Sequence, residues 1–363
     1  MACPDLYAEL CSFRNLELAY RKARKGKRSK KAACDFEFNP EENLLQLKRE
    51  LETSVYEPQP LKQFTIRDPK TRVISASHFR DRVVHHALCS IIQPIFERTF
   101  IDDSYANRIG KGTAKALKRF DSFKRSVSGN GRPVNNARDN NMVVGYVLKA
   151  DIRHYFDSVD HETLMGIVGR RVHDEKVLAL VRKILKNHAT SIPGKGMPIG
   201  NLTSQFFANL YLSELDYFVK HNLKARFYIR YVDDFVIMHP SKETLMVWKG
   251  QISGFLKTLK LELHPEKSKV YPLHRGVNFL GYRIFYHYIF LRRSNLRKME
   301  SRMRENESLY RRGEMTYEKV LQGFESWMSY ARYANSYVVR KEFVKKLNRE
   351  LGVLHTSVSH GRC

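Results

Sequence analysis

Apolar side chains recur along this chain with two different spacings, which predict where it forms helices and where it forms strands. The three- and four-residue spacing of a helix face is repeated over long stretches rich in leucine, valine and isoleucine. The predicted helices span residues 41–56, about 78–100, 161–171, 174–188, 203 to 221–225, and about 294–350. In the last segment, Trp327, Tyr330 and Tyr333 are predicted to share one face.

Shorter runs rich in β-branched and aromatic residues predict strands between these helices. They lie at residues 64–67, 73–76, 142–152, 227–239, 277–284 and 286–291. Residues 126–141 are rich in serine, glycine and asparagine and predict a flexible surface loop. Strands mixed with helices in the middle, and helices only at the end, predict an α+β core with a helical C-terminal module.

The charge of the chain indicates a polyanionic partner. With 363 residues, 42% of them hydrophobic, the chain can form two or three packed subdomains. Lys and Arg number 64 against 38 Asp and Glu, a net charge of +26, and residues 21–31 hold eight of these cations. Such an excess suits nucleic acid, with an anionic membrane surface as the second candidate. Taken alone, the 21–31 run predicts a solvated, mobile segment.

The chain gives no sign of a membrane span, a disulfide framework or a zinc site. No stretch approaches ~18 continuous apolar residues, and the first residues lack the apolar core of a signal peptide. The cysteines form no C-x-x-C pair and are predicted to be reduced thiols of a cytoplasmic protein. They are Cys3, Cys11, Cys34, Cys89 and Cys363. His85, His86 and His154 lack metal-ligand spacing and are predicted to pack or hydrogen-bond.

Candidate chemistry begins with Asp233 and Asp234, which lie between two β-rich runs at residues 226–230 and 235–239. A hairpin there would display both carboxylates at its tip, where burial and mutual repulsion would raise their pKa values. A divalent cation such as Mg²⁺ relieves that repulsion and prefers hard oxygen ligands. An ordinary acidic turn gives the same local pattern, so the pair alone does not establish a site.

A third carboxylate, Asp151, ends the apolar strand predicted at 142–152 and is distant in sequence from the pair. Joined to the pair, it completes what a two-metal phosphoryl-transfer site needs. In such a site two ions about 3.5–4 Å apart activate the attacking hydroxyl and hold the leaving pyrophosphate. The protein then contributes mainly positioning and charge neutralisation. Without the hairpin, a solvent-facing cap at the strand end is the preferred interpretation of Asp151.

Two segments around these aspartates resemble motifs A and C of reverse transcriptases. They are residues 150–161, ADIRHYFDSVDH, and residues 230–237, RYVDDFVI. Four further segments resemble the fingers motifs and motifs B, D and E, in the order that the family has them. They are residues 69–74 with 79–84, 194–205, 263–269 and 278–282. The resemblance implies a right-hand polymerase fold, with fingers, palm and thumb, and RNA-directed DNA synthesis.

The resemblance also implies roles for single residues. The ligands of two Mg²⁺ ions, with Mn²⁺ as a substitute, would be Asp151, Ile152, Asp233 and Asp234. Lys267 would protonate the leaving pyrophosphate, and the neighbouring Lys269 is the alternative. An aromatic ring at Phe156 would act as the steric gate that rejects a ribose 2′-hydroxyl. The residues implied to contact the incoming dNTP are Lys70, Arg72, Phe156, Ile199 and Gly200.

For the nucleic-acid strands, the resemblance implies an RNA template, a cDNA primer and no membrane partner. The primer grip would be Phe279, Leu280 and Gly281, and RNA or DNA contacts would come from Arg82 and Gln205. The implied subdomains are a basic N-terminal segment with fingers at 1–145, a palm at 146–292, and a helical thumb with a C-terminal tail at 293–363. Part of the fingers would be inserted at about 160–195.

Motif B departs from the common reverse transcriptase pattern. Ile199 stands before Gly200 where most members have glutamine, and Gln205 follows Ser204 where most have proline. This form resembles reverse transcriptases of diversity-generating retroelements. Those enzymes copy a template-repeat RNA with errors opposite adenine, so that mutated cDNA replaces a variable repeat. Without a bidentate amide at position 199, a hydrogen bond that orients the dNTP would be lost and base selection would loosen.

The same resemblance implies a small, basic, helical accessory protein, acting as an oligomer, and a cytoplasmic protein encoded by a bacterium or phage. Residues 294–350 could bind that protein, template–primer duplex, or both. A group II intron-like or defence-associated reverse transcriptase of ordinary fidelity is the first alternative. A non-catalytic RNA-binding scaffold is the second. Intact Asp151, Asp233 and Asp234 in a chain of net charge +26 argue against the scaffold.

Overall fold

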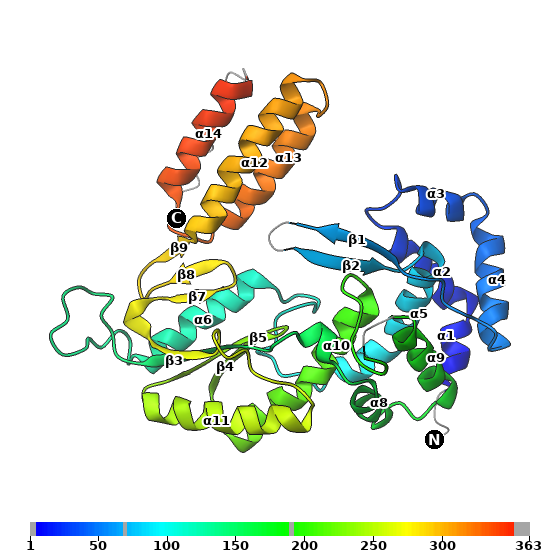
Figure 1. Ribbon diagram of the computed structural model, residues 1–363, viewed down its shortest axis with the longest axis horizontal. Helices are drawn as coiled ribbons and strands as arrows, with labels where there is room; N and C mark the ends of the chain where they lie inside the picture. Colours follow the sequence, from blue (N-terminus) through cyan, green and yellow to red (C-terminus); the bar gives the residue numbers. More distant parts are fainter. Residues whose placement is uncertain (1–4, 68–70, 189–191, 352–363) are drawn as a thin grey trace. The chain divides into compact units, whose positions relative to one another are not determined.

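The structure is a computed structural model that describes residues 5–67, 71–188 and 192–351. The chain forms two compact units (Figure 1). The first comprises Met1–Arg119, Leu148–Ile237 and Glu243–Lys269, and the second comprises Phe120–Val147, Met238–Lys242 and Val270–Cys363. This division crosses the subdomain boundaries predicted at residues 145 and 292, which stay a prediction.

The first unit begins with four helices, of which α1, α2 and α3 pack on the long helix α5, and α4 packs on the other three. Their bounds are α1 Leu6–Cys11, α2 Phe13–Arg24, α3 Lys31–Glu37, α4 Pro40–Glu52 and α5 Phe79–Glu97. Asp5 caps α1 by accepting a hydrogen bond from the amide of Ala8. The prediction of a mobile segment over 21–31 is wrong for residues 21–24, which end α2. The reason is that the helical spacing of buried residues continues to Ala23.

An antiparallel hairpin, β1 (Lys62–Ile66) with β2 (Arg72–Ala76), lies between α4 and α5 in the chain. Its register pairs Ile66 with Arg72, and residues 68–70 between them, including the dNTP candidate Lys70, lie outside the described residues. Side chains of β1 are exposed throughout, whereas β2 becomes partly buried toward Ala76. The two strands predicted at 64–67 and 73–76 are therefore confirmed.

A four-stranded sheet, ordered β4-β5-β3-β6, carries the acidic residues. The bounds are β3 Tyr146–Asp151, β4 Phe227–Tyr231, β5 Asp234–His239 and β6 Lys269–Pro272. The middle of β5 is buried on both faces, so the polar alternation of a half-exposed strand is missing from it. Helix α11 (Lys242–Thr258) runs along the sheet in Figure 1.

Further helices of the first unit follow β3, and acidic residues cap two of them, α8 and α9. Their bounds are α7 Tyr155–Ser158, α8 His161–Gly169, α9 Glu175–Lys186, α10 Leu202–Tyr217 and the π-helical turn Phe218–Asn222. Asp160 accepts from the amide of Thr163, and Asp174 accepts from the amide of Val177. The helices predicted at 161–171, at 174–188 and from residue 203 are confirmed.

Three predictions are corrected at element ends. Helix α4 ends at Glu52 rather than residue 56, and Leu45 on its predicted apolar face is 45% exposed. Strand β3 begins at Tyr146 rather than residue 142. The predicted strand 277–284 is a hairpin, because Leu280 and Gly281 have φ of 49° and 90°, which no strand residue adopts.

The second unit has a small antiparallel sheet, ordered β7-β8-β9. The bounds are β7 Val277–Phe279, β8 Tyr282–Ile284 and β9 Ile289–Leu291, after a 3₁₀ turn at Leu273–Arg275. Helix α6 (Thr113–Val127) begins in the first unit and continues into this one. Phe279 stacks on Phe120 of α6, with ring centroids 5.6 Å apart. One face of this sheet is therefore packed on the unit's own core.

Three helices follow this sheet and pack on one another: α12 Arg293–Arg311, α13 Tyr317–Ala331 and α14 Tyr337–Leu351. Their shared core contains Met299, Met303, Val320, Phe324, Phe343 and Leu347. The helical pattern predicted for 294–350 is confirmed. The single face predicted for Trp327, Tyr330 and Tyr333 is wrong, because α13 ends at Ala331 and leaves Tyr333 beyond the helix.

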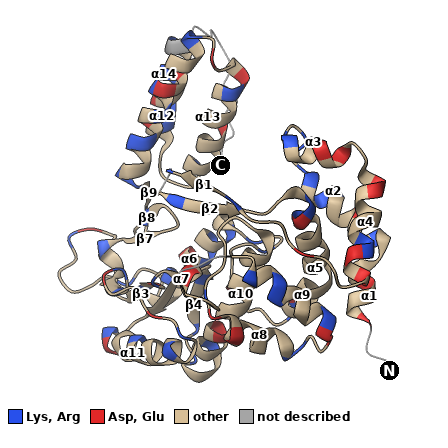
Figure 2. Ribbon diagram, turned by 45° about the vertical axis from the view of Figure 1, so that its right-hand side comes forward, with Lys and Arg blue, Asp and Glu red and all other residues tan. Residues whose placement is uncertain are grey.

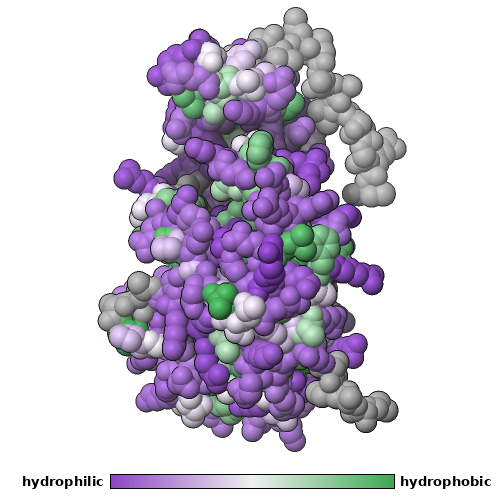
Figure 3. Space-filling view, turned by 90° about the vertical axis from the view of Figure 1, so that its right-hand side faces the viewer, coloured by the Kyte–Doolittle hydropathy of each residue, from purple (hydrophilic) through white to green (hydrophobic). Residues whose placement is uncertain are grey.

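These elements confirm the predicted α+β class. Lysine and arginine are spread over the helices and strands of both units (Figure 2). The face drawn in Figure 3 is mostly hydrophilic, with small, separate hydrophobic patches. Among the described residues, no helix is both long and apolar enough to span a membrane.

Candidate active site

The β4–β5 hairpin presents Asp233 and Asp234 through a turn of only two residues. The turn is Val232-Asp233, and Asp234 is the first residue of β5. Val232 has a φ of 56°, a left-handed conformation that is rare for a β-branched residue and costs roughly 1 kcal/mol or more. Strain of this kind persists only where the surrounding structure fixes it, and it is common at functional sites.

A buried arginine, Arg230, holds this turn in place through hydrogen bonds. The side chain of Arg230 is 0% exposed and forms a two-pronged ion pair with Asp216 at the end of α10, with N···O distances of 2.7 and 2.6 Å. Its remaining nitrogen donates to Asn209 Oδ1 at 3.1 Å and to the carbonyl of Val232 at 3.3 Å. The strained residue is thus tied to the core of the same unit.

Asp151 meets the hairpin from β3. The amide of Ile152 donates to the carbonyl of Asp233 at 3.3 Å, which holds the two segments side by side. The carbonyl of Asp151 accepts from the amide of His264 at 2.7 Å and from the hydroxyl of Ser268 at 3.3 Å. Residues 263–269, the predicted motif D, therefore position the backbone of Asp151.

The two hairpin carboxyls also lie in surroundings that disfavour their charged form. Burial raises the pKa of Asp234 to about 6, with smaller contributions from Asp151 and Asp233, and nearby Lys149 opposes the shift. Burial also raises the pKa of Asp233, and Asp151 adds to that shift. Oδ1 of Asp234 is buried and has no hydrogen-bond partner in the described part of the chain. Both carboxyls therefore carry a desolvation cost that a cation would offset.

Two lysines lie against these acids. Lys267 Nζ is 3.0 Å from Asp151 Oδ1, and Lys149 Nζ is 3.5 Å from Asp234 Oδ1. Over residues 5–67, 71–188 and 192–351, no three His, Cys, Asp or Glu side chains are arranged as a metal-binding cluster. The three carboxylates are therefore neighbours balanced by lysines in this structure, and they do not form a closed ligand cage.

The predicted motif B loop is fastened to β2. The amide of Ser75 donates to the carbonyl of Ile199 at 3.1 Å, and buried Asn201 bonds both Ser75 and Ser77. Gly200 has a φ of 116°, and a Cβ there would lie 2.8 Å from a methyl carbon of Ile74, so only glycine fits without strain. The loop and the hairpin β1–β2 are thereby joined within the first unit.

The other predicted contact residues of the first unit lie as follows. Arg72 begins β2, is exposed, and contributes a positive potential that opposes the raised pKa of Asp233. Phe156 is partly exposed in α7, with its ring against Tyr155. Gln205 is exposed on α10, and Arg82 of α5 donates to the carbonyl of Ser77 at 3.0 Å. Of this set, Arg72 is the residue whose charge acts on a site carboxylate, that of Asp233.

The predicted primer-grip residues lie in the second unit, at the β7–β8 turn. Phe279 is buried, whereas Leu280 and Gly281 form the turn itself. The carbonyl of Gly281 accepts hydrogen bonds from the hydroxyl of Tyr330 at 2.7 Å and from Asn295 Nδ2 at 3.2 Å. This turn is held through its backbone by the helices α12 and α13.

The histidines and buried cysteines carry none of this chemistry. Burial lowers the pKa of His85 to about 3 and that of His86 to about 4, so both are neutral packing residues. His154 is exposed in a left-handed conformation before α7. Burial raises the pKa of the Cys11 thiol to about 11. Cys11, Cys34 and Cys89 are all free thiols, as predicted.

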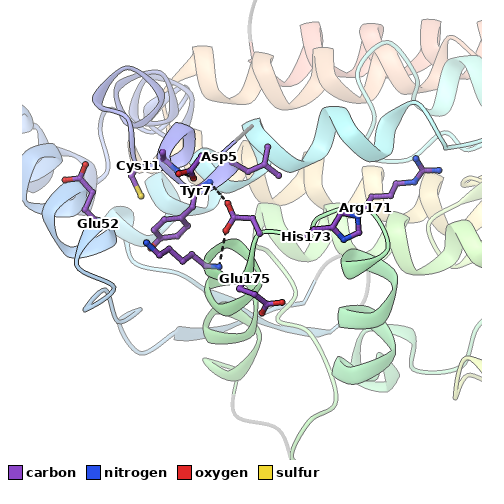
Figure 4. Close-up of a pocket in the computed structure, with 11 residues that line it drawn as sticks. Asp5, Tyr7, Cys11, Glu52, Arg171, His173 and Glu175 are labelled. Carbon is purple, nitrogen blue, oxygen red and sulfur yellow. Dashed lines mark hydrogen bonds between the residues drawn. The ribbon is translucent and has the colours of Figure 1, made fainter. Parts of the chain in front are cut away.

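A cavity of about 570 Å³ lies elsewhere in the first unit, lined by residues of α1, α4 and the α8–α9 turn (Figure 4). Its polar groups already have structural partners. Asp174 accepts from the amide of Tyr7 at 2.8 Å, and the hydroxyl of Tyr7 donates to the carbonyl of Leu51 at 2.7 Å. None of the site aspartates lines this cavity, so its size does not make it the catalytic centre.

Sequence reasoning missed four residues that build the site: Lys149, Asn201, Asp216 and Arg230. Arg230 and Lys149 stand in apolar strands, and a charged residue at such a position signals a buried partner. Asp216 on the apolar helix α10 gives the same signal. The sequence did not predict which acidic residue pairs with which basic residue, because the partners come from different helices and strands.

Residues 65–284 match the protein family described as reverse transcriptase (RNA-dependent DNA polymerase). The chain belongs to this family. The match runs from the end of β1 to the end of β8 and includes both acidic segments.

Two curated relatives are group II intron-encoded protein LtrA of Lactococcus lactis subsp. cremoris and protein YkfC of Escherichia coli strain K12. LtrA is 27% identical over 316 residues, which cover 67% of this chain and 50% of LtrA. YkfC is 26% identical over 278 residues, which cover 66% of this chain and 70% of YkfC. The chain thus spans about half the length of LtrA.

Among solved structures, a telomerase from Candida albicans in complex with a fragment of telomeric RNA has a similar fold. It is 13% identical, with a TM-score of 0.50, and the likeness covers 82% of this chain and 56% of that one. At this identity the likeness concerns the fold alone. It agrees with the polymerase-type α+β architecture inferred from the sequence.

Proposed function

We propose that this chain is an RNA-directed DNA polymerase that extends a DNA primer along an RNA template. The observation that carries the proposal is the meeting of Asp151 with the hairpin pair Asp233-Asp234. These residues come from different strands, yet backbone hydrogen bonds hold the strands together and burial raises the pKa of the pair. Membership of the reverse transcriptase family supports the same reaction.

The donor set fits a hard divalent cation such as Mg²⁺. Its ligands would be Asp151, Asp233 and Asp234, with the backbone carbonyl of Ile152 as a further oxygen donor. The raised pKa of Asp234 reflects a desolvation cost that Lys149, 3.5 Å from Oδ1, offsets only in part and that a cation would offset further. When bound, two such ions supply the positive charge that stabilises the attacking and leaving oxygens of phosphoryl transfer.

Lysine and arginine side chains of this chain are proposed to bind the triphosphate and to protonate the leaving pyrophosphate. Lys267 is 43% exposed and lies 3.0 Å from Asp151, so it can reach a proton acceptor at the same site. It is therefore the proposed donor of the proton to pyrophosphate, ahead of Lys269, which is exposed at the start of β6. Arg72, whose charge acts on Asp233, is proposed to hold the triphosphate with Lys70.

Two further residues are proposed to shape the nucleotide pocket. Phe156 would exclude a ribose 2′-hydroxyl with its partly exposed ring. Gly200 would let the motif B backbone approach the dNTP, since this loop tolerates no side chain beside Ile74. The proposed primer grip is the Leu280-Gly281 turn, and Arg82 and Gln205 are proposed to contact RNA or DNA.

Primer extension tests the reaction. A double variant, Asp233→Asn with Asp234→Asn, keeps the shape of the turn and removes both charges. We expect cDNA synthesis on a defined RNA with a DNA primer to fall about 1000-fold or more, because charge neutralisation at the phosphates is lost. Glu266→Gln, an exposed change on the neighbouring loop, is the matched control. Undiminished synthesis by the double variant would refute the proposal.

For fidelity, we propose the adenine-directed, error-prone chemistry of diversity-generating retroelements, with mutagenic retrohoming as its outcome. What supports it is the side chain at position 199: isoleucine cannot offer an amide, and its carbonyl is already engaged by Ser75. The relatives named above are equally compatible with a group II intron-like enzyme of ordinary fidelity. A basic, helical accessory oligomer would be a partner of the error-prone type.

Sequencing of cDNA made from one defined RNA separates these two types. The proposal predicts substitutions concentrated opposite template adenines, and Ile199→Gln should reduce them relative to errors at the other three bases. Val73→Ala, on the exposed part of β2, serves as the control variant. Errors spread evenly over the template bases would leave polymerase function intact and exclude the retroelement type.

A further inference from the structure

The small sheet of the second unit has an outward face that the proposed reaction does not use. Its inward face is apolar and buried, and includes Val277, Phe279, Tyr282, Ile284 and Leu291. On the outward face, the register places Asn278 opposite Arg283, and Arg283 opposite Phe290. An amide, a guanidinium and an aromatic ring therefore form one exposed row across the three strands.

Aromatic rings extend this row into the β8–β9 turn. Tyr288 and Phe290 are 47% and 44% exposed, and their rings are nearly parallel, at 15° with centroids 6.0 Å apart. Phe285 meets Phe290 edge-on at 5.7 Å, and the guanidinium of Arg283 lies 5.2 Å from the centre of the Phe285 ring. Large apolar rings gathered at the surface of a small sheet indicate a binding surface rather than a solvated face.

Asn278, Arg283, Phe285, Tyr288 and Phe290 together form an exposed platform. Hydrogen bonds hold its strand β9 and its β8–β9 turn in place. Ile289 bonds Asn335 in both directions: its amide donates to Asn335 Oδ1 at 2.8 Å, and its carbonyl accepts from the Asn335 amide at 2.7 Å. The turn is closed by the amide of Phe285 donating to the carbonyl of Tyr288 at 2.7 Å, and the amide of His287 donates to Asn141 Oδ1 at 2.9 Å. A ligand would therefore order few groups on binding.

The stretch of chain that forms the platform carries positive charge, and the Asp121 carboxylate beside it is paired with Lys124 and Arg125 of α6. Between Glu266 and Glu300 the chain contains no Asp or Glu. The cations of this stretch that belong to the second unit are Arg275, Arg283, Arg292, Arg293, Arg297 and Lys298. Arg283 itself donates to the carbonyl of Arg275 at 3.1 Å, which keeps its charge next to the rings. A surface that combines exposed rings with arginine side chains complements a chain of bases and phosphates.

We propose that the face formed by Asn278, Arg283, Phe285, Tyr288 and Phe290 binds single-stranded nucleic acid. Unpaired bases stack on Tyr288 and Phe290, and Arg283 contacts the phosphates. Duplex cannot use the rings in this way, because its bases already stack on one another inside the helix. The rings of Tyr288 and Phe285 flank the β8–β9 turn, at the end of β8 away from the Leu280-Gly281 turn of the proposed primer grip, whereas Asn278 borders the primer-grip residue Phe279. The platform binds an unpaired segment of template or product.

Fluorescence anisotropy with the full chain, without dNTPs, tests this surface. The probes are a labelled 20-mer of single-stranded RNA, a duplex of the same length, and a single strand of the same charge with abasic positions. Tyr288→Leu with Phe290→Leu keeps the apolar area and removes the rings. We expect it to weaken single-strand binding about tenfold, as loss of base stacking predicts, and to leave duplex binding within about twofold. The abasic strand should bind parent and variant alike.

Two controls separate stacking from other causes. Phe38→Leu removes a ring that is 84% exposed in the first unit and should change nothing. Arg283→Ala should reduce the dependence of single-strand affinity on salt by about one phosphate contact. Equal single-strand affinity in the leucine double variant and the parent overturns the proposal, and an apolar protein contact, which leucines preserve, then becomes the better assignment. Because no DNA synthesis is measured, this result is independent of the polymerase proposal.

Discussion

Two hairpins of this protein each turn at a residue with a left-handed backbone conformation, but the turns hold different chemical groups in place. The β4–β5 hairpin turns at Val232 and the β7–β8 hairpin turns at Leu280, and both residues have positive φ, 56° and 49°. At the first turn, the groups held in place are side-chain carboxylates. At the second, the group held in place is a backbone carbonyl, that of Gly281, bound by Tyr330 and Asn295.

The difference lies in what stabilises each strained turn. The first is tied to a fully buried ion pair, Arg230–Asp216, inside the unit that carries the aspartates. The second is tied by neutral hydrogen bonds to a helical module. A buried ion pair gives geometric precision at a high desolvation cost, and neutral hydrogen bonds give a modest net stabilisation. The two hairpins should therefore respond very differently to substitution.

The largest effect is expected from Arg230→Met. Removing the guanidinium leaves Asp216 buried without its partner, which should lower the free energy of unfolding by about 3–5 kcal/mol. Urea unfolding measures it. In the double variant Arg230→Met with Asp216→Leu, most of that stability should return, while cDNA synthesis stays low because the Val232 carbonyl has lost its donor. Full activity in the double variant would show that Arg230 does not position the turn.

A smaller effect is expected from pH at the first hairpin. The folded-state pKa of Asp234 is raised to about 6, so its protonated form favours the folded state. The associated stability is present below the unfolded-state pKa and is lost as pH rises through about 6. With EDTA present, the parent should lose on the order of 2 kcal/mol more than Asp234→Asn between pH 4 and pH 7. Parallel stability curves for the two proteins would contradict this.

At the second hairpin, Tyr330→Phe should cost about 1 kcal/mol of unfolding free energy, the net value of a neutral hydrogen bond. The carbonyl of Gly281 keeps Asn295 as a donor, so the loss stays small. Tyr333→Phe, at an exposed tyrosine nearby in the chain, is the control and should cost nothing measurable. A loss as large as that of Arg230→Met would mean that the two hairpins are stabilised alike.

The smallest effect is expected from Val232→Gly. Relief of left-handed strain, roughly 1 kcal/mol, and the entropic cost of glycine, roughly 0.5–1 kcal/mol, nearly cancel. The melting temperature should therefore stay within about 2 °C of the parent. Val73→Gly, at an exposed strand position without positive φ, should lower it clearly. Equal losses in both variants would show that Val232 is not strained.

Much of the first hairpin was predictable from the sequence. Two β-rich runs flank Asp233-Asp234, and this local pattern suffices because strand propensity and turn position are encoded within a few residues. The helix starts at His161 and Glu175 were equally readable, since Asp160 and Asp174 cap them. The β7–β8 hairpin was missed although Gly281 is a turn signal, because the left-handed conformation of Leu280 beside it depends on the surroundings.

By itself, then, the sequence determined the α+β class, most element positions, and the motifs that assign the family. Only the tertiary structure decided that Lys267 pairs with Asp151, that Arg230 pairs with Asp216, and that Gly200 lies against Ile74. Local patterns record the period of the backbone and the identity of side chains. Pairings between distant residues arise from strand order and helix packing, which are set by the burial of the whole unit.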